Sequence, residues 1–216
     1  GCRHLPTTFL YYTSAVLTDS NSSITSFDGA FVASDTIKIS ASDTFMTQVF
    51  AGDADCTQEL LRIILKRQDL TVTKSVTQLT IGNLYGRSVR LDIYANDAAG
   101  KQYDIEVQQE DKGARPERAR LNSALFDSRL TTAGESYAEL PETYIIFITA
   151  NDVLKDGLPV YTIERTIQET GKLFGDRAHI VYVNGAYRGE DEVGQLMHDF
   201  NCNDYRKIQN PKIAAR

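Results

Sequence analysis

The stretch 86–110 constrains the fold most, because its side chains alternate twice between apolar and polar. Two apolar sets occur at every second position: Val89, Leu91, Ile93 and Ala95, then Tyr103, Ile105 and Val107. A period of two is typical of strands with one buried face. The residues between, Asn96-Asp97-Ala98-Ala99-Gly100, favour a turn. The pattern therefore predicts a β-hairpin.

The register of this hairpin decides which polar side chains meet. A turn centred near Ala99 places Asp92 opposite Glu106, and Gln108 shares their face. Facing carboxylates repel one another unless a cation lies between them, and Mg²⁺ prefers such oxygen ligands. The same spacing also fits a hairpin whose polar face meets only solvent. A slip of one residue in the register would remove the pairing.

The spacing of these polar residues also resembles a family motif. Asp92, followed fourteen residues later by Glu106-Val107-Gln108, resembles the D…(D/E)-x-K core of the PD-(D/E)XK nucleases. The sequence is more similar to one branch of that family, the Rpn-type recombination-promoting nucleases, or PD-(D/E)XK nuclease family transposases. Gln commonly stands at the lysine position in that branch, as Gln108 does here. Collinear segments extend the resemblance from about Phe45 to about Phe200: GRSVRLDIYA, the basic run 115–120, ELPETYIIFIT and HIVYVNGAYRG.

The resemblance implies an α/β fold with a restriction-endonuclease-like PD-(D/E)XK core. A small mixed β-sheet with a central hairpin would be flanked by helices. Asp92, Glu106 and the carbonyl of Val107 would hold Mg²⁺ or Mn²⁺, and Gln108 would orient the attacking water. Helices that precede the sheet in this family often supply another acid, for which Glu59 is the candidate. Glu59 equally fits a helix N-terminus that it stabilises through the helix dipole.

The nucleic acid would be bound by a basic segment that follows the hairpin. Its candidates are Lys112, Arg115, Arg118 and Arg120, since arginine is well suited to phosphate recognition. An ordinary solvated helix face explains Arg120 equally well. The net charge of −6 lacks the basic footprint of most DNA-binding domains, so positive charge must be concentrated locally.

The remaining pattern predicts elements around the hairpin and a domain division. Apolar residues at helical spacing predict a helix over 57–66, with Asp55 as its N-cap. The other predicted elements are strands over 70–83, 143–149, 160–163 and 180–183, and helices over 116–131 and 190–200. The strand 143–149 is expected to be buried on both faces. Residues 1–41 form an extension of unassigned role, 42–200 the nuclease-like domain and 201–216 a polar tail.

Composition and motif searches exclude several other classes of protein. No stretch approaches the ~20 apolar residues of a membrane span. The three cysteines lack C-x-x-C spacing, which favours reduced thiols in a cytoplasmic protein. No G-x-S-x-G, P-loop or H-E-x-x-H motif occurs.

The function that the resemblance implies is that of a Mg²⁺-dependent DNA endonuclease with a role in bacterial recombination or mobile elements. The expected partner is DNA and not a membrane, and a homodimer is left open. The alternative is a nuclease-fold protein without catalysis that binds nucleic acid or a partner protein. Gln108 keeps this alternative open, because an amide supplies neither positive charge nor an ammonium-type proton donor.

Overall fold

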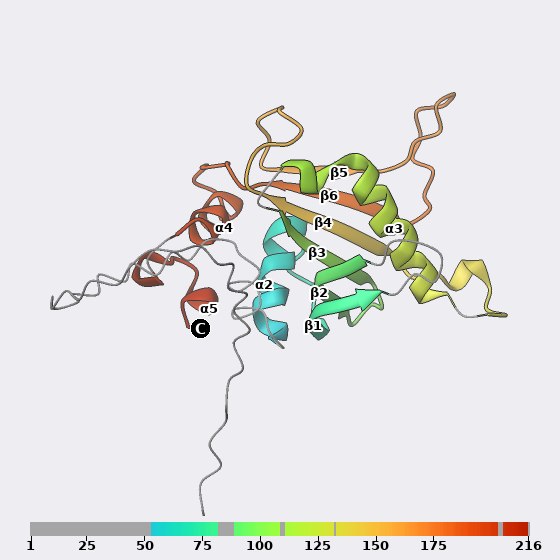
Figure 1. Cartoon of the computed structure of the whole chain (residues 1–216), viewed down its shortest axis with the longest axis horizontal. Coiled ribbons are helices and arrows are strands. Elements are labelled where there is room, and N and C mark those ends of the chain that lie inside the picture. Colours follow the sequence, from blue (N-terminus) through green and yellow to red (C-terminus); the bar gives the residue numbers. More distant parts are fainter. Residues whose placement is uncertain (1–52, 82–88, 109–110, 132, 203–204, 216) are drawn as a thin grey trace, which may run out of the picture. The chain divides into compact units, whose positions relative to one another are not determined.

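The computed structural model describes residues 53–81, 89–108, 111–131, 133–202 and 205–215, and the predicted extension 1–41 lies outside these ranges. Its strands form one mixed sheet in the order β1-β2-β3-β4-β6-β5 (Figure 1). Their bounds are Val72–Ile81 for β1, Val89–Asp97 for β2, Gln102–Gln108 for β3, Thr143–Thr149 for β4, Val160–Ile163 for β5 and Ala178–Asn184 for β6.

The described α-helices are α2 (Ala54–Leu65), α3 (Pro116–Leu130), α4 (Glu192–Phe200) and α5 (Pro211–Ala214). Helix α3 begins with Pro116, whose fixed φ and missing N–H suit the first helical position. The α/β architecture with a mixed sheet, a central hairpin and flanking helices is confirmed.

The hairpin of β2 and β3 has the predicted register. Ile93 pairs with Ile105 and Asn96 pairs with Gln102, which is the pairing of a turn centred near Ala99. The turn is closed by Asp97, whose Oδ1 accepts from the backbone N–H groups of Ala99 at 3.0 Å and Lys101 at 2.9 Å. Gly100 has φ of +82°, which a side chain would disfavour.

Strand β4 provides the buried centre of the sheet. It runs parallel to β3 on one side and to β6 on the other, and six of its seven residues are buried. Such a strand has no solvent-facing side, which explains the nearly continuous apolar sequence TYIIFIT. The three parallel strands therefore end at the same edge of the sheet, beside Gln108.

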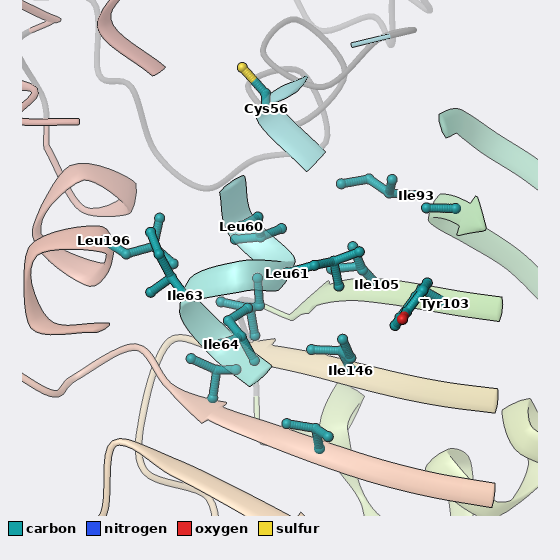
Figure 2. Close-up of a cluster of buried hydrophobic side chains, with 14 of the residues drawn as sticks. Cys56, Leu60, Leu61, Ile63, Ile64, Ile93, Tyr103, Ile105, Ile146 and Leu196 are labelled. Atoms are coloured by element: carbon teal, nitrogen blue, oxygen red, sulfur yellow. The ribbon is translucent and has the colours of Figure 1, made fainter. Parts of the chain in front are cut away.

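The two faces of the sheet carry separate hydrophobic clusters. On one face, Leu60, Leu61 and Ile64 of α2 pack with Ile93 and Ile105 (Figure 2). On the other face, α3 crosses the strands and brings apolar residues to a second cluster (Figure 1). These residues are Ala119 and Phe126, which pack with Ile145, Phe147 and Tyr182.

Two local predictions differ from the structure. The N-cap of α2 is Asp53 and not Asp55, because the helix begins earlier and Asp53 Oδ1 accepts from the N–H groups of Asp55 at 2.8 Å and Cys56 at 3.0 Å. The segment 201–216, expected to be a polar tail, carries Ile213 into the α2 cluster. Buried Asp199 fixes this segment by accepting from the Gln209 N–H.

No helix within the described ranges is both long and apolar enough to cross a membrane.

The corrected cap gives a direct test of the α2 boundary. Asp53→Ala should lower the free energy of unfolding by about 1 kcal/mol, because two N–H groups of the first turn lose their acceptor. Asp55→Ala is the matched control and should cost less, since its carboxylate only complements the helix dipole. Urea denaturation of the two variants compares them; an equal or larger loss for Asp55→Ala would contradict the assignment.

Candidate active site

The candidate site lies where β2 and β3 separate. The ladder between them ends at the pair Ile93–Ile105, so Asp92 is the first β2 residue beyond it. Beyond the ladder, the Asp92 side chain rather than its backbone contacts β3, since its Oδ2 accepts from the Val107 N–H at 2.9 Å. On the other side of β2, Gln78 has φ of +56° and lies between Thr77 and Leu79, which pair with Ile93 and Leu91. A left-handed residue at this point marks a local irregularity beside Asp92.

The carbonyl of Val107 faces the same side of β3 as Asp92. The carbonyl of the next residue, Gln108, accepts from the Ala150 N–H at 3.0 Å and therefore points toward β4. Successive residues of a strand direct their backbone groups to opposite neighbours, and the N–H and carbonyl of one residue share a side. Since the Val107 N–H meets Asp92, its carbonyl also points toward β2.

Glu106 projects from β3 toward α3, and its side chain is only 1% exposed. Its Oε2 accepts from Nη2 of Arg118 at 3.1 Å and from Nε2 of Gln108 at 3.3 Å. Its Oε1 is buried and has no hydrogen-bond partner among the described residues. Burial, followed by the charge of Asp92, raises the pKa of Glu106 to about 7, while Arg118 acts in the opposite direction.

Asp104 is an acidic residue of this region to which the sequence assigned no role. Both carboxyl oxygens are buried without a hydrogen-bond partner among the described residues, and the same holds for Nδ2 of Asn122. Burial, then Glu106 and Asp92, raise the pKa of Asp104 well above its usual range. The alternation predicted its face, but only the position of α3 explains its burial.

The predicted basic residues do not behave alike. Arg115 and Arg120 are exposed at the start of α3, as expected for residues that meet an external anion. Arg118 is turned inward to Glu106 and to Gln108, whose Oε1 lies 3.1 Å from Nη1. The side chain of Lys112 lies outside the described part of the structure.

The structure does not bring Glu59 to this group. Glu59 forms an ion pair with Lys212 of α5, with Oε2 and Nζ 2.7 Å apart. Its helix, α2, packs on the face that contains Ile105, whereas Glu106 points to the opposite face and to α3. The expectation that Glu59 joins the metal site therefore finds no support in the described contacts.

The residues present fit a hard divalent ion, although not a site built of side chains alone. Within the described ranges, no group of three or more His, Cys, Asp or Glu residues could hold a metal. Asp92, Glu106 and the Val107 carbonyl offer two carboxylates and one backbone oxygen, a set typical of Mg²⁺ sites that retain several waters. The buried Oε1 of Glu106, which lacks a partner in the described structure, is the atom that such an ion would satisfy.

The family comparison agrees with this geometry. The family model described as PD-(D/E)XK nuclease family transposase matches residues 48–186. The chain belongs to this family. The matched region runs from α2 to β6 and contains Asp92, Glu106 and Gln108. The family suggests nuclease activity, and PD-(D/E)XK nucleases generally use divalent metals. No match was found among curated proteins.

The raised pKa of Glu106 predicts how the stability of the metal-free protein depends on pH. The folded state keeps the Glu106 proton up to about pH 7, whereas the unfolded chain loses it near 4.5. This contribution to stability is therefore complete below about pH 4.5 and is lost as the pH rises through 7. The free energy of unfolding of the wild type should therefore fall by on the order of 2–3 kcal/mol between pH 4.5 and 7.5. Glu106→Gln should abolish this decrease.

Urea denaturation in EDTA at several pH values measures this difference. Glu117→Gln is the matched control, because Glu117 is an exposed glutamate in the first turn of α3, the helix toward which Glu106 projects. The control should follow the wild-type pH dependence. Parallel curves for wild type and Glu106→Gln would show that Glu106 titrates normally.

Proposed function

We propose that this chain is a metal-dependent DNA endonuclease in which Asp92, Glu106 and the Val107 carbonyl hold Mg²⁺ or Mn²⁺. One observation carries the proposal. At the point where β2 and β3 separate, Asp92 meets the backbone of Val107 while Glu106 keeps one buried carboxyl oxygen without a described partner. Family membership supports the same chemistry, because the family suggests phosphodiester hydrolysis.

A bound divalent ion would lower the pKa of a water and offset charge on the scissile phosphate. The protein fixes its own ligands before that step. The Val107 N–H holds Asp92 Oδ2 at 2.9 Å, and the parallel pairing of β3 with β4 fixes the backbone on which Glu106 stands. The Gln108 side chain adjoins Glu106 and would orient the attacking water through its amide.

DNA would approach along the start of α3. Arg115 and Arg120 are exposed there, and they provide local positive charge on a chain whose net charge is −6. The family membership supports a role in recombination or mobile elements of bacteria, and with it a cytoplasmic location.

A second candidate function also has an observation in its favour. Arg118 and Gln108 already occupy Oε2 of Glu106, so the described network can serve as a closed structural ion pair. A nuclease-fold protein without catalysis, which binds nucleic acid or a partner protein, fits this arrangement.

The role of Asp92 separates the two functions, and Asp92→Asn is the most informative variant. It removes the charge of the side chain but keeps an oxygen that can accept from the Val107 N–H. Asp92→Ala would instead leave that N–H without its acceptor. In the wild type, Mg²⁺ at ten times its Kd should raise the free energy of unfolding by about 1.4 kcal/mol. Asp92→Asn should lose this gain and the nicking of plasmid DNA, while its metal-free stability is kept or slightly increased.

Thermal melting with and without Mg²⁺ or Mn²⁺, beside a plasmid-nicking assay, measures both effects. Asp156→Asn is the matched control, since Asp156 is an exposed aspartate outside this site. Wild-type protein that neither gains stability from either ion nor nicks DNA would exclude the endonuclease and leave the binding module.

DNA binding should depend on salt through the exposed arginines of α3. Arg115→Gln combined with Arg120→Gln should reduce the slope of log Kd against log salt concentration by roughly two, one for each lost phosphate contact. Fluorescence anisotropy with a labelled duplex measures this slope in the Asp92→Asn background, in which cleavage is absent. Identical slopes with and without the two arginines would remove this face of α3 from the DNA interface.

A further inference from the structure

The proposed endonuclease lacks a positive charge at one position of its motif. The family pattern has a lysine where this chain has Gln108, and an amide cannot neutralise an anion. The structure brings a cation to the same place from a different element. Arg118, in the first turn of α3, contacts both Gln108 and Glu106 through separate nitrogens.

Gln108 acts as the connector between the two charged groups. Its Nε2 donates to Glu106, and its Oε1 accepts from Arg118. The amide is also confined by Gly113, because a Cβ at that residue would lie 2.0 Å from Oε1 of Gln108. The main chain at Gly113 thus leaves the space that the amide fills, and this packing keeps Oε1 directed at the guanidinium.

Arg118 is placed between the protein interior and solvent. Its side chain is 41% exposed, whereas that of Glu106 is 1% exposed. The two hydrogen bonds described for its guanidinium use two of five N–H groups. The neighbouring residue Ala119 is fully buried, and the Arg118 N–H bonds to the Arg115 carbonyl at 2.9 Å, so the helix backbone is fixed. The outward N–H groups can therefore meet an anion without movement of α3.

We infer that Arg118 supplies the positive charge that Gln108 lacks. In the metal-free protein it neutralises Glu106, and with metal and DNA bound it pairs with a non-bridging oxygen of the scissile phosphate. The planar guanidinium suits this exchange, because its N–H groups can hydrogen-bond to the oxygens of either a carboxylate or a phosphate. The inference rests on the proposed endonuclease function and assigns to Arg118 a role in the reaction beyond general DNA affinity.

Metal binding gives the first test, because Arg118 and the ion compete for Glu106. In the absence of DNA, and at a pH at which Glu106 is ionised, Arg118→Gln should lower the melting temperature without metal, since Glu106 loses its cation. The same variant should bind Mn²⁺ more tightly, with a half-saturating concentration at least fivefold lower than in the wild type. The dependence of melting temperature on Mn²⁺ concentration gives this value without any need for cleavage.

Cleavage kinetics give the second test. Arg118→Gln should reduce kcat for plasmid nicking by about 100-fold, the usual effect of losing one group that stabilises transition-state charge. Arg118→Lys keeps the charge but not the fork, and should lose about tenfold in kcat while it retains the wild-type melting temperature. Adding Gln108→Lys to Arg118→Gln should restore at least tenfold, because the charge returns on β3.

Arg129→Gln is the matched control, since it removes one exposed arginine from the same helix at its last turn, over the Tyr94 ring. It should leave kcat and the Mn²⁺ midpoint unchanged. Wild-type cleavage and an unchanged Mn²⁺ midpoint in Arg118→Gln would overturn the inference and leave the endonuclease intact. If Arg118→Gln does not fold, a kcat of Arg118→Lys equal to that of the wild type would overturn the inference about Arg118. A wild-type protein without metal response or nicking removes both proposals.

Discussion

The buried carboxylate of Glu106 is the constraint on which the rest of the site depends. An ionised carboxylate with 1% exposure is costly unless charge and hydrogen bonds compensate it. Two side chains donate hydrogen bonds to this carboxylate: Gln108, two residues along the same strand, and Arg118 from α3. Compensation is incomplete, since Oε1 has no described partner and Asp92 adds a second negative charge nearby. A divalent ion, as proposed for this site, would offset that imbalance.

The two helices that cover the sheet differ in how much apolar surface they pack against it. Helix α2 packs through Leu60, Leu61 and Ile64 and forms an ordinary hydrophobic layer (Figure 2). Helix α3 buries Asn122 and Ser123 beside only a few apolar residues. Its interface with β3 contains buried polar atoms of Asp104, Glu106 and Asn122 that have no partner among the described residues, whereas α2 has aliphatic packing. The face of the sheet that holds the acids is therefore less stabilised, and the opposite face supplies most of the apolar core.

The hydrogen-bond network of Arg118, Gln108 and Glu106 would have a different role with and without a bound metal. Without a metal, the Arg118–Glu106 pair is a partly buried ion pair, and its geometry is that of a closed structural contact. In the proposed endonuclease, a divalent ion on Glu106 would leave the same guanidinium available to a reacting phosphate. An arginine on a helix would serve both states better than a lysine on β3, because its planar fork would keep defined directions while its partner changes.

The sequence by itself determined the hairpin and its register, because period-two alternation and turn chemistry are local properties of the chain. It also determined the buried strand β4, since TYIIFIT has no polar side to expose. Only the tertiary structure decided the burial of Asp104, the inward turn of Arg118 and the separate position of Glu59. Each depends on which face of the sheet a helix covers, and that is set by packing between segments far apart in the chain. A local pattern identifies a polar face, but it does not show which other element will close over it.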